Sequence, residues 1–274
     1  MRIRLGHSPD PDDAFMFWAL EAGAVDTRGF AFEPVHADIQ TLNEWALEGR
    51  LEVTALSCAA YPLVQDRYAL LPHGASIGAG YGPIVVARDE LSLDDLRALE
   101  VATPGGLTTA HLTARLALGA GARFRDVPFD AILDEVASGR AAAGVVIHEG
   151  QLTYGDAGLH KVLDLGEWWL LETGLPLPLG VNTVRRDVER QEELSAVLLE
   201  SITAGLANRD EAMRYALRFG RGIGHDVADR FVGMYVNELT CDVGDEGRRA
   251  VAELLRRGEA VGAFPQPVRI DFVA

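Results

Sequence analysis

Strand patterns alternate with helical patterns along the amino-terminal part of this chain, and this alternation restricts its fold more than any other feature. Residues 2–7, 30–39 and 51–57 have the apolar alternation or apolar runs of strands, and residues 14–20 and 41–49 between them have helical spacing. Because strands joined by helices pair side by side in the same direction, the pattern predicts an α/β fold with a mostly parallel sheet and helices on both sides.

The helix predicted over residues 41–49 has recognisable ends. Thr41 and Glu44 have the spacing of a capping box, in which two side chains bind the free N–H groups of the first helical turn. Gly49 follows the last apolar position, where many helices end. We therefore expect Thr41 to cap this helix and Gly49 to terminate it.

The order of elements around one buried strand recurs later in the chain. Residues 48–57 (EGRLEVTALS) and 138–148 (SGRAAAGVVIH) each run from a helix end through Gly-Arg into an apolar strand with a polar tip. An amphipathic helix precedes each strand. Two similar units predict two lobes of related build rather than one continuous sheet.

Two extended segments, 81–90 and 175–187, separate the middle of the chain from its ends. We interpret them as crossings between two α/β lobes, with lobe one formed by residues 1–86 and 184–274 and lobe two by residues 87–183. Lobe one would end in helices over 188–207, 209–219, 226–238 and 245–257. Two crossings make a hinged cleft, and ligands bind where the carboxyl ends of strands face such a crevice.

The charge and the cysteines of the chain exclude several classes of partner. With 25 Lys and Arg against 41 Asp and Glu, the net charge is −16, which repels nucleic acids and anionic membranes. A small anionic substrate stays compatible, because local donors act within a Debye length. Residues 1–10 lack the apolar stretch of a signal peptide, so we expect a cytoplasmic protein. Cys58 and Cys241 lack the spacing of a metal or redox motif, so we expect no metal and no cofactor.

His148 stands at the predicted carboxyl end of the second unit's strand, and Ser57 ends the matching strand of the first unit. Such strand ends face the cleft, so we interpret His148 as a candidate base that titrates near neutral pH. The alternative is a hydrogen-bonded histidine at the edge of a sheet. A zinc site of the HExxH type is excluded, because Leu152 occupies the position of the second histidine.

The segment TPGGLTTA (103–110) joins a strand to a helix. Gly105 and Gly106 let the backbone approach a ligand, and Thr108 or Thr109 can cap the helix. Free N–H groups and hydroxyls would together form a pocket for an anion or a carboxylate. The alternative is a plain strand-to-helix turn, which also requires glycine.

A turn-rich segment, HSPDPDDAF (7–15), follows the first strand. Ser8 lies closest to the strand end, so we expect its side chain in the cleft. Asp10, Asp12 and Asp13 are expected to cap the next helix, since carboxylates are favoured at the positive end of a helix.

Eight motifs spread over nearly the whole chain carry a family resemblance when they are taken together. They are HSPDPDDAFMFWAL, DIQTLNEWALEGRLEVTALSCAAY, GYGPIVVAR, TPGGLTTA, VVIHEGQLTY, LGEWW, TGLPLPLG and YVNELTCDVGDEG. The set resembles the menaquinone-biosynthesis branch of the type II periplasmic-binding-protein fold, in particular the family of 1,4-dihydroxy-6-naphthoate synthases of the futalosine pathway.

The resemblance implies a lyase without cofactor that converts cyclic dehypoxanthinylfutalosine to 1,4-dihydroxy-6-naphthoate. The family's catalytic histidine falls on His148, which would remove a proton so that ring opening and aromatisation proceed. The family's other substrate contacts fall on Ala55, Leu56, Ser57, Thr108 and Thr109. The family pattern has lysine at the position of Ala55 and SPCPND over residues 8–13, so this chain has one cation fewer and more carboxylates beside the expected cleft.

Two other functions fit the same cleft. A non-catalytic solute-binding protein for a small anion would share the fold, although transport binders act outside the cytoplasm and this chain shows no secretion signal. A paralogous enzyme of the same pathway, such as a chorismate dehydratase, matches the motifs less well.

Overall fold

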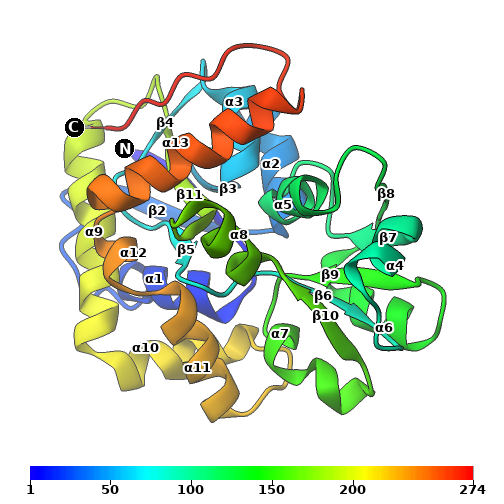
Figure 1. Ribbon diagram of the computed structural model, residues 1–274. Helices are drawn as coiled ribbons and strands as arrows, with labels where there is room; N and C mark the ends of the chain where they lie inside the picture. Colours follow the sequence, from blue (N-terminus) through cyan, green and yellow to red (C-terminus); the bar gives the residue numbers. More distant parts are fainter. Residues whose placement is uncertain (274) are drawn as a thin grey trace.

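The computed structural model of the protein describes residues 1–273 and contains two β-sheets, each packed with its own helices (Figure 1). The first sheet has the strand order β2-β1-β3-β11-β4, and β5 also pairs with β11. Its strands are β1 (Arg2–His7), β2 (Ala31–His36), β3 (Val53–Ser57), β4 (Tyr68–Leu70), β5 (Ser76–Gly78) and β11 (Leu177–Arg185). Two sheets in place of one confirm the predicted two-lobed α/β fold.

The second sheet has the strand order β10-β6-β9-β7-β8 and forms the smaller lobe. Its strands are β6 (Ile84–Ala87), β7 (Glu100–Thr103), β8 (Arg123–Asp126), β9 (Ala143–Val146) and β10 (His160–Asp164). The helices of this part of the chain are α4 (Leu93–Ala98), α5 (Thr109–Leu118), η2 (Phe129–Ala131), α6 (Ile132–Ala137), α7 (Gly150–Thr153), η3 (Tyr154–Ala157) and α8 (Leu165–Thr173).

The remaining helices come from the two ends of the chain and surround the first sheet (Figure 1). They are α1 (Pro11–Glu21), α2 (Ile39–Glu48), η1 (Cys58–Ala60), α3 (Tyr61–Val64), α9 (Gln191–Ala207), α10 (Arg209–Ala216), η4 (Leu217–Phe219), α11 (His225–Tyr235), α12 (Glu238–Cys241) and α13 (Gly244–Ala260). The four helices expected at the carboxy-terminal end are confirmed as α9, α10 with η4, α11 and α13.

Both sheets are mixed, so the prediction of a mostly parallel sheet is wrong in this respect. Strand β1 is parallel to β2 and β3, and β7 is parallel to β8 and β9, as helix-joined strands should be. The two crossing segments are the exception. Each becomes a strand, β6 or β11, that runs antiparallel to every partner it has. The chain pattern shows that these segments are extended but not with which strands they pair.

The proposed lobe boundaries at residues 86/87 and 183/184 fall within these two strands. Strand β6 pairs in the second sheet from Ile84 onward, and β11 pairs in the first sheet from Leu177 onward. The lobes therefore share two short connections, one before β6 and one before β11. The boundaries themselves stay a prediction.

Alternating residues of the first sheet pack into two different apolar clusters. Ala69 belongs to the cluster formed with α1, α9, α10 and α11, whereas its neighbours Tyr68 and Leu70 belong to the cluster formed with α13. Val53 and Leu56 of β3 divide in the same way. Successive side chains of a strand point to opposite faces, so the sheet is a buried central layer with helices on both sides.

The helix over the motif TLNEWALEG begins one turn earlier than expected. Asp38 is its N-cap, with extended backbone (φ −62°, ψ 158°), and its carboxylate accepts the N–H of Thr41 at 3.0 Å. The capping box predicted for Thr41 and Glu44 is therefore wrong. An aspartate caps as well as a threonine, and the earlier start adds a turn of helix. The predicted end is confirmed, because Gly49 adopts φ 70° as the C-cap.

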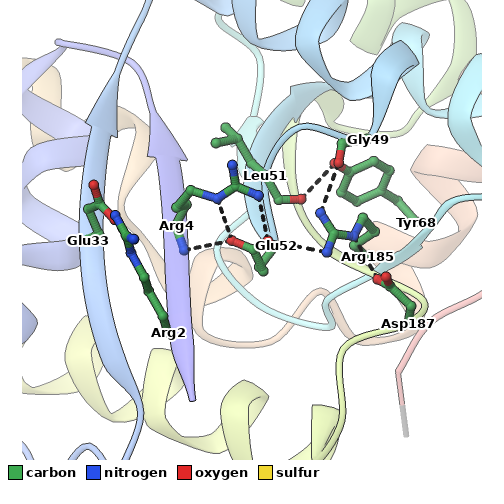
Figure 2. A network of polar contacts seen from close by, with 9 residues as sticks. All are labelled: Arg2, Arg4, Glu33, Gly49, Leu51, Glu52, Tyr68, Arg185 and Asp187. Carbon is green, nitrogen blue, oxygen red and sulfur yellow. Dashed lines mark hydrogen bonds and ion pairs between the residues drawn. The ribbon is translucent and has the colours of Figure 1, made fainter.

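Figure 2 shows a network of polar contacts at the end of β3 away from Ser57. Glu52 accepts hydrogen bonds from the backbone N and from Nε of Arg4 in β1, at 3.0 and 2.8 Å, and pairs with Nη2 of Arg185 in β11 at 3.2 Å. Burial opposes ionisation of this carboxyl, but the hydrogen bonds from Arg4 and the charges of Arg4 and Arg185 together outweigh it, and the pKa of Glu52 falls to about 2. One carboxylate thus links three adjacent strands.

Over residues 1–273, none of the helices combines the length and the apolar character that crossing a membrane would require.

Candidate active site

A cavity of about 110 Å³ lies between the two lobes. All the substrate-contacting residues expected from the sequence line it. They are Ser8 after β1, Ala55, Leu56 and Ser57 in β3, and Thr108 and Thr109 at the start of α5. The first four come from the larger lobe and the threonines from the smaller one, so both lobes contribute to one space.

The side chain of Ser57 is fixed by an amide that the sequence did not single out. Asn43 of α2 is fully buried, and its Oδ1 accepts the backbone N–H of Ser57 at 2.9 Å. Its Nδ2 donates to Oγ of Ser57 at 3.0 Å. Because Oγ accepts this hydrogen bond, its own proton is left to donate into the cavity.

Thr108 and Thr109 use their hydroxyl groups to build the site. Thr108 Oγ1 donates to the carbonyl of Gly105 at 2.8 Å and accepts the N–H of His111 at 3.1 Å, which makes it the N-cap of α5. Thr109 Oγ1 donates to the carbonyl of Leu179 at 2.6 Å and accepts the N–H of Ala59 at 3.1 Å. Both protons are therefore committed to the protein, so neither hydroxyl is free to donate to an anion.

The start of α5 offers backbone donors in place of these hydroxyls. The first N–H groups of a helix have no partner within the helix, and Thr108 satisfies only that of His111. Thr109 and Ala110, the first two residues of α5, both line the cavity. Their N–H groups lie at the positive end of the helix, which favours negative charge.

Three carboxyl groups at the start of α1 line the cavity, and the sequence indicated only a role at the helix end for them. Asp10 is the N-cap of α1 but makes no side-chain bond to it, and Asp12 and Asp13 are buried. Burial raises the pKa of Asp13 to about 6, and burial together with the charges of Asp13 and Asp10 raises the pKa of Asp12 well above its usual range. The predicted positions at the start of the helix are confirmed, because Asp12 and Asp13 lie in the first turn of α1, but Asp10 does not cap the helix with its side chain. Asp13 accepts the backbone N–H of Ser8 at 2.8 Å.

The cavity has an unusual charge composition for a site that would bind an anion. Among the described residues, its lining includes Asp10, Asp12 and Asp13 but no Lys or Arg. Ala55, where the family pattern has lysine, presents only a methyl group. Nor does any group of three metal-ligating side chains converge on this cavity within residues 1–273. Backbone N–H groups, hydroxyls and the side-chain amide of Asn182 are thus the donors of this lining.

His148 lies two residues beyond the end of β9 and is 6% exposed. Its neighbour Ile147 lines the cavity, but His148 itself does not. The ring packs edge-on against Phe129, with the ring centres 5.7 Å apart. Nδ1 accepts the N–H of Gly150 at 3.0 Å, so the proton of the neutral ring is on Nε2. Nε2 is buried without a partner in the described part of the chain. Burial lowers the pKa of His148, Glu149 opposes this shift and Arg221 adds to it.

An arginine that the sequence did not indicate joins the two lobes beside His148. Arg221 Nε donates to Oε1 of Glu149 at 3.0 Å, and its Nη2 pairs with Oδ1 of Asp10 at 2.6 Å. Glu149 belongs to the smaller lobe and Asp10 to the larger one. The carboxylate of Glu149 also lies 3.8 Å from Nδ1 of His148. Arg221 thus connects Asp10 of the larger lobe with Glu149, the neighbour of His148, in the smaller lobe.

Two α/β lobes with a shared cavity at the ends of their strands define the class of proteins with the type II periplasmic-binding-protein fold. The alkanesulfonate-binding protein of Xanthomonas axonopodis pv. citri superposes with a TM-score of 0.74 at 12% identity, covering 97% of this chain and 94% of that one. An X-ray structure from Archaeoglobus fulgidus superposes with a TM-score of 0.91 at 43% identity, covering 96% and 98% of the two chains.

Within that class the sequence matches one family. The model of the menaquinone biosynthesis family matches residues 3–260, and the chain belongs to this family. The 1,4-dihydroxy-6-naphthoate synthase of Thermus thermophilus is 45% identical over 268 residues, which is 97% of each chain. That of Streptomyces coelicolor is 37% identical, covering 96% of this chain and 95% of its own length. The chain is homologous over nearly its whole length to enzymes of menaquinone biosynthesis.

Proposed function

We propose that this protein is a 1,4-dihydroxy-6-naphthoate synthase that converts cyclic dehypoxanthinylfutalosine by proton abstraction and ring opening. The observation that carries the proposal is the meeting of Ser8, Ser57, Thr108 and Thr109 in one cavity between the lobes. The 45% identity to the Thermus thermophilus synthase over nearly the full chain supports the choice of reaction.

The substrate's carboxylate and its hydroxyl-bearing part would bind at different ends of the cavity. The carboxylate binds the N–H groups of Thr109 and Ala110 at the start of α5, which supply positive charge without a cation. The hydroxyl groups of the substrate donate hydrogen bonds to the carboxyl groups of Asp12 and Asp13, which line the cavity where basic residues are absent. Raised pKa values also let Asp12 and Asp13 supply protons at mildly acidic to neutral pH.

His148 would be the base, at Nε2. This atom carries the proton while Nδ1 accepts from Gly150, so the ring must first change tautomer. With the proton on Nδ1, that nitrogen would donate to the carboxylate of Glu149, which now lies 3.8 Å away, and Nε2 would present a lone pair. Glu149 is then a positioning residue for His148. Burial keeps the ring neutral at pH 7 and therefore able to accept the proton.

A solute-binding role is the second candidate, because alkanesulfonate-binding proteins share the fold. Incubation of the purified protein with cyclic dehypoxanthinylfutalosine distinguishes the two. The enzyme releases 1,4-dihydroxy-6-naphthoate, which is followed by its absorbance, with more turnovers than protein molecules. Binding without release of the naphthoate would favour the solute-binding role. Chorismate in a parallel reaction tests the paralogous dehydratase activity.

A further inference from the structure

Two histidines and a glutamate meet at one edge of the first sheet. His7 ends β1 and His36 ends β2, and the two strands are parallel with these residues directly paired in register. Neighbouring residues of paired strands point to the same face, so both rings lie on one side of the sheet. Glu21, the last residue of α1, reaches the same place. The ligating atoms of the three side chains all lie within 4.8 Å of one another.

The ring of His7 already has the orientation of a metal ligand. Its Nδ1 lies 2.8 Å from the carbonyl oxygen of Ser8 and must donate its proton there, because a carbonyl only accepts. Nε2 therefore presents a lone pair, and it lies 3.1 Å from Nε2 of His36. A metal-binding histidine typically fixes its tautomer in this way, through a backbone carbonyl at the other nitrogen.

The surroundings of the cluster leave an ion both a space and a route. His7 is fully buried, whereas the side chains of Glu21 and His36 are accessible to solvent. His7 and Glu21, but not His36, line an adjoining cavity of about 50 Å³ whose other walls are apolar side chains. This volume exceeds the roughly 10–15 Å³ that one water molecule needs. An ion can thus enter from solvent and keep a water molecule as a further ligand.

We propose that His7, His36 and Glu21 form a binding site for a divalent transition-metal ion of the zinc type. Two imidazoles and one carboxylate favour such an ion over magnesium or calcium, which prefer oxygen ligands. Ligand nitrogens at about 2.0–2.1 Å from a tetrahedral zinc ion are roughly 3.3 Å apart, close to the 3.1 Å separation of the two Nε2 atoms. The site joins β1, β2 and α1, and through the Ser8 carbonyl it supports the segment that leads to Asp10 and the first turn of α1.

The site is independent of the proposed function and is tested by metal binding. The full-length protein, freed of metal by dialysis against a chelator, is titrated with Zn²⁺ in a calorimeter and with Co²⁺ in a spectrophotometer. We expect one Zn²⁺ per chain, a visible Co²⁺ absorption band and a higher melting temperature in Zn²⁺. The variants are His36→Ala and Glu21→Gln, both at accessible positions. His160→Ala is the matched control, since His160 is exposed and its Nδ1 lies 3.9 Å from Glu90.

Loss of a residue that only supports a metal ligand typically lowers metal affinity about 10–100-fold. Loss of a ligand itself should cost at least as much, so His36→Ala should lower Zn²⁺ affinity by that factor or more, while His160→Ala retains the wild-type affinity. Glu21→Gln should weaken binding and shift the Co²⁺ spectrum. Failure of the wild-type protein to bind one Zn²⁺ per chain would overturn the proposal and leave the two histidines as a hydrogen-bonded pair. So would equal affinities of the His36→Ala and His160→Ala variants.

Discussion

The guanidinium of Arg221 binds the carboxylate of Glu149 across the two lobes through two hydrogen bonds, Nε to Oε1 at 3.0 Å and Nη2 to Oε2 at 2.5 Å. Arg221 also stacks on Phe129 of the smaller lobe, at 5.2 Å from the ring centre, and pairs with Asp10 of the larger lobe. Its backbone φ of 46° is rarely adopted by a residue other than glycine. These contacts hold the lobes together beside the cavity. They also stabilise the unfavourable backbone conformation of Arg221, which would otherwise relax.

Removal of this arginine should open the lobes and weaken catalysis. In Arg221→Ala the buried carboxylate of Glu149 loses its partner, so we expect the free energy of unfolding to fall by about 2–5 kcal/mol. Small-angle scattering should show a larger radius of gyration. The specificity constant kcat/KM should fall about 100-fold, the cost of misplacing a catalytic group by about 1 Å.

The double variant Arg221→Ala with Glu149→Gln separates these effects. It removes the buried charge of Glu149 and leaves only Asp10 without its arginine, so most of the lost stability should return, while the lobes stay unconnected and kcat/KM stays low. Recovery of both stability and turnover in the double variant would show that Arg221 only neutralises Glu149.

Replacing Thr108 and Thr109 by valine tests what their hydroxyls do. Each hydroxyl donates to a backbone carbonyl and accepts a backbone N–H. The double variant removes all four hydrogen bonds, although the Gly105 carbonyl keeps the N–H of Thr108. We expect a loss of about 1–2 kcal/mol of stability per site. Serine at both positions keeps these hydrogen bonds and should behave like the wild type. Thermal melting of the valine and serine variants provides the measurement. An unchanged melting temperature for the valine variant would show that the hydroxyls have no structural role and would return them to substrate binding.

Asp12 should destabilise the folded protein at neutral pH. Its pKa is raised in the folded state, so the unfolded chain loses this proton at lower pH, and stability falls as the pH rises above about 3.9 toward the folded pKa. Asp12→Asn removes this cost. Its melting temperature should exceed that of the wild type at pH 7 by about 2–4 °C, the shift that roughly 1 kcal/mol gives in a chain of this size, and by less at pH 4.5.

The matched control for this prediction is Asp89→Asn, because Asp89 is an exposed aspartate. It should leave the melting temperature unchanged at both pH values. Equal stability of Asp12→Asn and the wild type at pH 7 would contradict the raised pKa. Turnover should fall in Asp12→Asn if this carboxyl binds or protonates the substrate.

The residues predicted correctly as cavity lining share a local origin. Ser57 ends a buried strand and Thr108 starts a helix after two glycines, so short stretches of sequence are enough to place them near a cleft. The pairing of β6 and β11 was not predictable in the same way, because strand direction and register depend on partners far along the chain. The capping-box spacing of Thr41 and Glu44 is local, and it does not show that the helix starts a turn earlier, at Asp38.

The roles of Asn43, Arg221 and the three aspartates in the candidate site depend on tertiary contacts. Arg221 reaches Glu149 only because α10 and η4 bring the loop after them against the smaller lobe. The aspartates resemble helix caps in sequence, and only their burial between the lobes shows that they line the cavity. The cluster of His7, Glu21 and His36 also forms from three separate elements, so no short motif indicates it.

The pH dependence of turnover tests the state of His148. A neutral imidazole accepts the proton, so kcat/KM should rise with pH through an apparent pKa below the ordinary histidine value of about 6.5, since burial lowers it. Glu149→Gln removes the charge that opposes this shift, so the apparent pKa should fall further. An unchanged apparent pKa in Glu149→Gln would show that this carboxylate does not act on His148.

The most direct test of the account compares the wild type, His148→Asn and His160→Asn with cyclic dehypoxanthinylfutalosine, measuring naphthoate formation and substrate binding in the same samples. His160 is exposed and belongs to β10, so its variant is the control. We predict that the wild type and His160→Asn turn over repeatedly, and that His148→Asn binds the substrate with nearly unchanged affinity but turns it over at least about 100-fold more slowly. Normal turnover by His148→Asn, or tight binding without any naphthoate from the wild type, would contradict it.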